Sequence, residues 1–206
     1  LAYDKAIELD GENAVDNESL SSAWIGKGTA LAKLGRYNES FEAFDKAIEL
    51  MPGDDLKELE QIVQIWLDKG EALNETGNGD DARKAFQKAL EVSDEALLND
   101  SEQASFMLLK GNALFNLGRY DEAREAYDQA IKIASPNSFH VPSAWIGEGK
   151  ALLALGRNEE ALEAFRQALE INPTLVEAWK GKGESQKALG RARDASLSFH
   201  VAEKLG

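Results

Sequence analysis

Residues 24–36 read WIGKGTALAKLGR, and residues 145–157 read WIGEGKALLALGR, so that nine of the thirteen positions are identical. Three looser copies exist: WLDKGEALNETGN from Trp66, MLLKGNALFNLGR from Met107 and WKGKGESQKALGR from Trp179. Five copies in the same phase indicate a repeated structural unit rather than duplicated active-site loops.

The spacing within each copy is that of a helix. In the first copy Trp24, Gly28, Leu31 and Leu34 recur at intervals of three and four residues, which places them on one helical face. A glycine stands where a residue of positive φ would end each helix, at Gly35, Gly77, Gly118, Gly156 and Gly190. The segment after each copy, for example EEALEAFRQALEI, has the same periodicity. The unit is therefore predicted to be helix, tight turn, helix.

This pattern resembles the tetratricopeptide repeat, a 34-residue helix pair with the signature W-x₂-L-G-x₂-Y, then A-x₃-F, then P. The matching residues form full repeats at 21–54, 63–96, 104–137 and 142–175, and a last repeat at 176–206. Residues 1–13 resemble the second helix of a further repeat. The resemblance implies an all-α fold: one array over residues 1–206, a right-handed superhelical α-solenoid of antiparallel helix pairs with about 11 helices.

The linkers in the N-terminal half are longer than the family norm. The anchors Trp24, Trp66, Met107, Trp145 and Trp179 are separated by 42, 41, 38 and 34 residues. The inserts DLKELEQI (55–62) and LLNDSEQ (97–103) consist largely of good helix formers and contain neither Gly nor Pro. We expect them to extend the flanking helices, and a flexible loop is the alternative.

Glycine recurs inside the first helices, where each one costs roughly 1 kcal/mol relative to Ala. Gly28, Gly70, Gly111, Gly149 and Gly183 are predicted to let paired helices approach while Trp and Phe fill the adjacent space. Gly26, Gly147 and Gly181 precede three of these by two residues and point about 200° away from them. We expect these three to face the groove of the array, where a partner backbone could approach closely. Tolerated sequence drift is the alternative.

Composition excludes several classes of function. The chain has no cysteine, so disulfides and thiolate metal sites are excluded. Its net charge of −14 disfavours a nucleic-acid partner, because such binding depends on Lys and Arg contacts to phosphate. No apolar run approaches the roughly 20 residues that span a bilayer, and no signal peptide is visible. We expect a cytoplasmic protein without membrane contact.

No catalytic, cofactor or metal site is predicted. The Gly-Lys-Gly at 26–28 lacks the P-loop spacing and a preceding strand. The two histidines, His140 and His200, have no metal-ligand spacing. Carboxylate pairs such as Glu159 and Glu160 stand at helix starts, where the helix dipole favours negative charge. The expected protein is not an enzyme.

The resemblance implies a protein-interaction scaffold whose concave groove is lined by first-helix positions. The candidate groove residues are Ile25, Gly26, Thr29, Leu67, Asp68, Glu71, Glu75, Leu108, Asn112, Phe115, Ile146, Gly147, Lys150, Lys180 and Gly181. This groove is acidic early, apolar in the middle and mixed to basic late. It lacks the Lys, Asn and Arg set with which a well-known variant of the family clamps chaperone tails.

Two functions follow from these residues. The main hypothesis is a module that binds a protein or peptide segment with an apolar centre and a basic region facing Asp68, Glu71 and Glu75. The alternative is an assembly or self-association module of a larger protein whose activity lies outside this chain. The half repeat at the start favours the alternative, and so does the end, where we expect Leu197, Phe199 and Val201 to have no capping helix.

Overall fold

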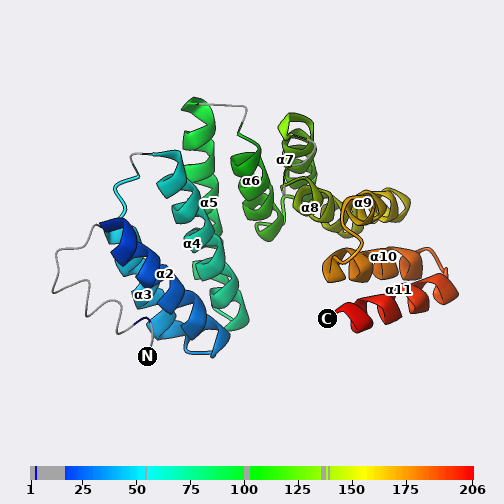
Figure 1. Ribbon diagram of the computed structural model, residues 1–206, viewed down its shortest axis with the longest axis horizontal. Helices are drawn as coiled ribbons and strands as arrows, with labels where there is room; N and C mark the ends of the chain where they lie inside the picture. Colours follow the sequence, from blue (N-terminus) through cyan, green and yellow to red (C-terminus); the bar gives the residue numbers. More distant parts are fainter. Residues whose placement is uncertain (1–2, 4–16, 54, 100–102, 136–137, 139) are drawn as a thin grey trace. The chain divides into compact units, whose positions relative to one another are not determined.

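The computed structural model describes Tyr3 and residues 17–53, 55–99, 103–135, 138 and 140–206. Regular secondary structure in these ranges is entirely helical (Figure 1). The helices are α2 (Asn17–Lys33), α3 (Tyr37–Glu49), α4 (Leu56–Glu75), α5 (Gly79–Asn99), α6 (Ala104–Asn116), α7 (Tyr120–Ile133), α8 (His140–Ala154), α9 (Asn158–Ile171), α10 (Val176–Ala188) and α11 (Ala192–Leu205). The predicted all-α fold of helix pairs is confirmed. The helix expected at 1–13 lies outside the described residues, apart from Tyr3.

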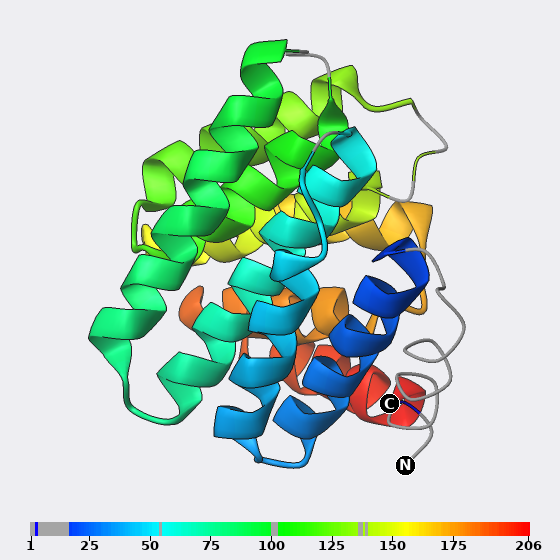
Figure 2. The same ribbon diagram turned by 90° about the vertical axis from the view of Figure 1, so that its left-hand side faces the viewer.

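The chain forms two compact units, residues 1–96 and 97–206. In the first unit α2 pairs with α3, and α4 contacts both (Figure 2). In the second unit α6, α8 and α10 are neighbours in that order, and each pairs with the helix that follows it. The first helices of successive pairs therefore form one layer in this unit, and the second helices form the other.

The predicted glycine turns are confirmed. Gly35, Gly77, Gly118, Gly156 and Gly190 have φ between 71° and 78°, a region that only glycine enters without strain. The residue after each glycine donates its N–H to a carbonyl five residues back, as from Arg157 to Leu152 at 2.8 Å. This bond closes the Schellman motif and satisfies carbonyl groups at the helix end.

The core is built from aromatic rings packed on glycine. Phe44, Phe86, Tyr127 and Phe165 are almost completely buried. Each lies against the glycine of its own pair: a Cβ added to Gly28 would be 2.6 Å from Phe44, and one added to Gly149 would be 2.8 Å from Phe165. No real Cβ fits at such distances. The prediction for the second glycine of each Gly-x-Gly is therefore confirmed.

The insert at 55–62 extends a helix, as predicted. Asp55 caps α4 by accepting a hydrogen bond from the Glu58 N–H at 2.8 Å, and the helix then runs for 20 residues. The helix α5 has 21 residues and includes 97–99, whereas 100–102 lie outside the described residues. The loop alternative is wrong for residues 56–62.

Candidate protein-interaction groove

An acidic pocket of about 250 Å³ lies in the first unit where α2, α3 and α4 meet. Four of its residues belong to the predicted groove. The full lining is Thr29, Ala32, Lys33, Tyr37, Asp68, Glu71, Ala72 and Glu75. Three carboxylates thus share the pocket with a single ammonium group.

Helical spacing explains why the carboxylates converge. Asp68, Glu71 and Glu75 are separated by three and four residues on α4, so all three stand on one face of that helix. Thr29 and Lys33 are four apart on α2 and form the opposite wall. Because α2 and α4 are neighbouring first helices, two predicted faces meet at this pocket.

Burial and hydrogen bonds raise the pKa values of two side chains at the pocket above their ordinary values. Burial raises the pKa of the Asp68 carboxyl, and this effect is opposed by the 2.7 Å hydrogen bond from the Gln64 amide and by the charge of Lys33. The hydroxyl of Tyr37 donates a hydrogen bond to the Glu75 carboxylate, which raises the pKa of that tyrosine. The pocket therefore holds a carboxylate whose charged form is disfavoured by burial. A cation that enters the pocket would favour this charged form and would itself be stabilised.

Asp68→Asn is expected to stabilise the first unit. A carboxyl whose pKa is raised by folding binds its proton more tightly in the folded state, so its charged form destabilises the fold at neutral pH. We therefore expect a higher unfolding midpoint at pH 7 for this variant than for the wild type. The gain should shrink as the pH falls through the pKa of Asp68. Thermal unfolding by circular dichroism between pH 4 and 8 measures it, and a lowered midpoint at pH 7 would contradict the assignment.

In the second unit, the predicted groove residues of α6 already have partners. Asn112 accepts a hydrogen bond from the buried Tyr127 hydroxyl at 2.9 Å. The ring of Phe115 packs against that of Tyr120, with centroids 5.4 Å apart. Leu108 is half-buried. The Asn112 side chain is therefore engaged in a hydrogen bond to a core residue, and Phe115 leaves only part of its ring accessible to a partner.

The remaining predicted groove residues differ in how much surface they present. Leu67 and Ile146 are buried, with 2% and 7% of their surface exposed, so they belong to the core. Ile25 is half-buried, and Lys180 is exposed. Lys150 is exposed and forms an ion pair with Glu177, which joins α8 to α10.

The prediction for the first glycine of each Gly-x-Gly is wrong. Gly147 and Gly181 are buried, and they face the aromatic ring of the preceding helix pair rather than an open groove. A Cβ on Gly147 would lie 2.5 Å from the Tyr127 ring, and one on Gly181 would lie within 3.0 Å of the Phe165 ring. Each ring is thus held between two glycines, one from its own pair and one from the next.

Gly26 has a similar partner. Its missing side chain leaves room for the ring of Tyr3, which would lie within 3.0 Å of an added Cβ. The sequence contained a signal for this role, because each of the three Gly-x-Gly stretches follows a segment of helical periodicity that contains an aromatic residue, Tyr3, Tyr127 or Phe165. Packing between successive pairs, not access for a partner, accounts for Gly147 and Gly181, and the Tyr3 ring occupies the equivalent place at Gly26.

Family models place the chain among known proteins. Models described as tetratricopeptide repeat match residues 21–54, 63–95 and 102–174. The chain belongs to the tetratricopeptide repeat family. The comparison with curated protein sequences gives no match.

Solved structures of similar fold support the architecture of this tetratricopeptide repeat chain. BtubC (BKLC) from P. vanneervenii has a TM-score of 0.69 at 16% identity, over 99% of this chain and 88% of that one. A MamA crystal structure has a TM-score of 0.53 at 18% identity, over 90% and 91%. MamA from Desulfovibrio magneticus RS-1 has a TM-score of 0.54 at 17% identity, over 90% and 94%. At these identities the likeness shows the fold alone.

Membership of the family establishes the general role. This tetratricopeptide repeat chain is a protein-interaction scaffold whose partners are proteins, and such repeats are typically non-catalytic. Among the described residues, no helix is both long and apolar enough to cross a membrane.

Proposed function

We propose that this scaffold binds a partner segment by taking a Lys or Arg side chain into the acidic pocket of the first unit. The observation that carries the proposal is the convergence of Asp68, Glu71 and Glu75 on one pocket beside Tyr37. A guanidinium or ammonium group there would gain charge-assisted hydrogen bonds, which are about twice as strong as neutral ones.

The size of the pocket favours a side chain over a small-molecule ligand. Its volume of about 250 Å³ is below the roughly 300–1,000 Å³ of typical ligand sites. Its lining also holds few large apolar side chains, which such sites usually need. One long basic side chain of a protein partner matches both the volume and the charge.

We propose separately that α6 of the second unit offers an apolar contact to a protein partner. Leu108 and Phe115 are half-buried there, so each keeps some apolar surface for a partner. Single apolar residues at a surface are common, so this part of the proposal rests on the family's use of first-helix positions.

Peptide display tests the charge preference without a known partner. A random 12-residue library selected on the wild-type chain should enrich peptides that contain Lys or Arg. Selection on Asp68→Lys with Glu71→Lys should lose that preference and favour Asp or Glu. Glu42→Lys with Glu95→Lys is the matched control, because it makes the same charge change at exposed sites on the second helices α3 and α5. Equal basic enrichment on all three proteins would refute the proposal.

A second proposal is self-association through the ends of the array. It is supported by exposed apolar side chains on α11, among them Leu197 and Leu205. Sedimentation velocity at several protein concentrations tests this, since the sedimentation coefficient should rise with concentration.

A further inference from the structure

One charged side chain of α8 departs from the pattern of the repeats. The third residue after each anchor Trp or Met is a lysine in four of the five first helices and an acid in α8: Lys27, Lys69, Lys110, Glu148 and Lys182. This position faces the second helix of the preceding pair, as the ion pair between Lys69 of α4 and Asp45 of α3 shows. The acid in α8 therefore places the opposite charge at the junction with α7.

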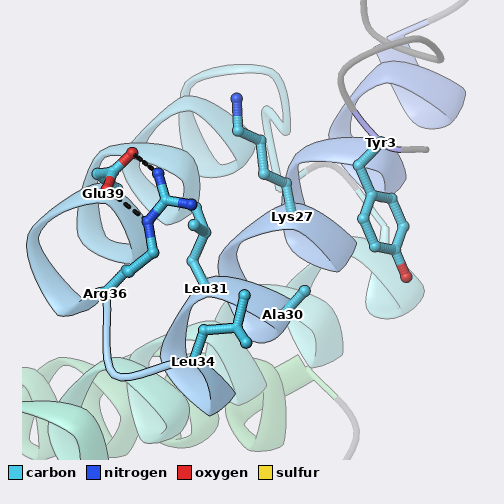
Figure 3. Close-up of a pocket in the computed structure, with 7 residues that line it drawn as sticks. All are labelled: Tyr3, Lys27, Ala30, Leu31, Leu34, Arg36 and Glu39. Carbon is cyan, nitrogen blue, oxygen red and sulfur yellow. Dashed lines mark hydrogen bonds and ion pairs between the residues drawn. The ribbon is translucent and has the colours of Figure 1, made fainter. Parts of the chain in front are cut away.

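The lysines at this position lie near carboxylates. The ammonium of Lys69 is 2.5 Å from the Asp45 carboxylate and 5.3 Å from the centroid of the Trp66 ring. Only 16% of the Lys69 side chain is exposed. At the equivalent place in α2, Lys27 lines a hollow together with Glu39 (Figure 3). A lysine at this position is thus matched by a charge of the opposite sign.

Glu148 meets a charge of its own sign at the α7–α8 junction. Asp128 of α7 is the equivalent of Asp45 in α3, since each directly follows the buried ring of its helix. Burial, and after it the charge of Asp128, raises the pKa of the Glu148 carboxyl. The ionised form of Glu148 is therefore less favourable in the folded chain than in water.

Two polar atoms near this junction are buried without a hydrogen-bond partner. They are Oε2 of Glu148 and Nε of Arg124 on α7. Among the described residues, no other side-chain nitrogen or oxygen is in this state. A buried polar atom that makes no hydrogen bond keeps the full cost of its removal from water. The polar groups of the described chain are thus least well satisfied where α7 meets α8.

Basic groups around Glu148 offset only part of this cost. Arg124 and Lys132 of α7, and Arg157 just before α9, act to lower the pKa of Glu148. Lys132 is already bound to Asp128 at 2.5 Å, and Arg157 forms an ion pair within its own turn. The pKa of Glu148 stays above its ordinary value despite these three cations.

Protonation of Glu148 removes the causes of the cost together. A neutral carboxyl no longer repels Asp128, is less costly to bury and has an O–H to donate. The cost of the ionised form is fully present above the pKa that Glu148 has in the folded chain. It disappears as the pH falls through that value, because the folded chain binds this proton more tightly than the unfolded chain does. Mild acidification should therefore strengthen the contact between α7 and α8.

We propose that the α7–α8 junction is a pH-sensitive joint of the second unit, which opens more readily when Glu148 is charged and closes more tightly when Glu148 takes up a proton. The helix pairs α6–α7 and α8–α9 meet at this junction. The joint therefore controls how firmly two successive pairs hold together. It is separate from the acidic pocket, whose residues all belong to the first unit.

Hydrogen exchange of the full chain, followed by mass spectrometry, tests the joint. Glu148→Gln has nearly the size of Glu but is neutral and has an N–H to donate, so it imitates the protonated form. At pH 7, amides in α7 and α8 should be at least about fivefold more protected in this variant than in the wild type. This difference should vanish as the pH is lowered from about 8 to about 5, because the wild type then takes up its proton.

Glu184→Gln is the matched control. It makes the same change at an exposed place on α10, so the protection of α7 and α8 should equal that of the wild type at each pH. Lower protection in Glu148→Gln at pH 7, a difference that does not depend on pH, or the same gain in Glu184→Gln would overturn the joint.

Asp128→Asn tests the source of the pH dependence. It removes the like charge and keeps Glu148, so α7 and α8 should gain their protection at a lower pH than in the wild type. A gain at the same pH, or at a higher one, would refute the part assigned to Asp128.

Discussion

Phe165→Ala is expected to destabilise the second unit by about 3–5 kcal/mol. The ring is fully buried and fills the space between α8, α9 and α10, where Gly149 and Gly181 have no side chains of their own. Its removal would leave a void bounded by glycine, which neighbouring side chains cannot fill. At roughly 2–4 °C per kcal/mol, the unfolding midpoint should fall by about 6–20 °C.

Phe199→Ala is the matched control for this change. It removes the same side chain at the same place in a helix pair, but this ring lies against one glycine, Gly183, and 37% of the residue is exposed. The cost should be about 1–2 kcal/mol, since less apolar surface is lost from the core. Both midpoints come from thermal unfolding followed at 222 nm, the usual circular dichroism wavelength for helix. Equal losses for the two variants would contradict the double-glycine packing.

Gly181→Ala should also destabilise the protein, although Ala is the better helix former. The change gains about 1 kcal/mol of helix propensity. It also places a Cβ within 3.0 Å of the Phe165 ring, which cannot retreat because Gly149 lies close on its other side. Overpacking of this kind costs typically 1–3 kcal/mol, and a stiff ring held on both sides belongs at the upper end. We expect a net loss of about 1–2 kcal/mol.

Gly79→Ala provides the control for the glycine change. Gly79 begins α5, and a Cβ there would meet nothing within 4 Å, so only the propensity gain applies. The unfolding midpoint of this variant should stay level or rise.

Combining Gly181→Ala with Phe165→Leu should recover part of the loss, because the two sites are in contact and their effects do not add. A rise in midpoint for Gly181→Ala alone would refute the close packing.

These glycines also show where sequence reasoning stops. Periodicity correctly placed Gly147 and Gly181 on the side of their helix away from the paired helix. It could not tell which neighbour lies on that side, since this depends on how successive pairs stack. The structure places Tyr127 and Phe165 there, so the predicted open groove floor does not exist at these positions.

The predicted groove residues show the same limit. Their place on the face of a single helix could be predicted, whereas their burial by neighbouring helices could not. Asp68, Glu71 and Glu75 could be placed on one face from their spacing along a single helix, and the structure brings them together. The burial of Leu67 and Ile146 could not be foreseen, because it depends on the neighbouring helices packed against them. Tyr37 also lines the pocket but was not predicted to do so, because it lies on α3 rather than on a first helix.

Fluorescence anisotropy with a matched pair of labelled peptides tests the central claim most directly. Both peptides have the same leucine-containing centre, and one carries two Arg where the other carries two Glu. The wild-type chain should bind the Arg peptide at least about 10-fold more tightly, and this preference should weaken with salt. Asp68→Lys with Glu71→Lys should reverse the preference, while Glu42→Lys with Glu95→Lys should keep it. Equal affinity of the wild type for both peptides, or a preference that survives reversal of the pocket charges, would contradict the account.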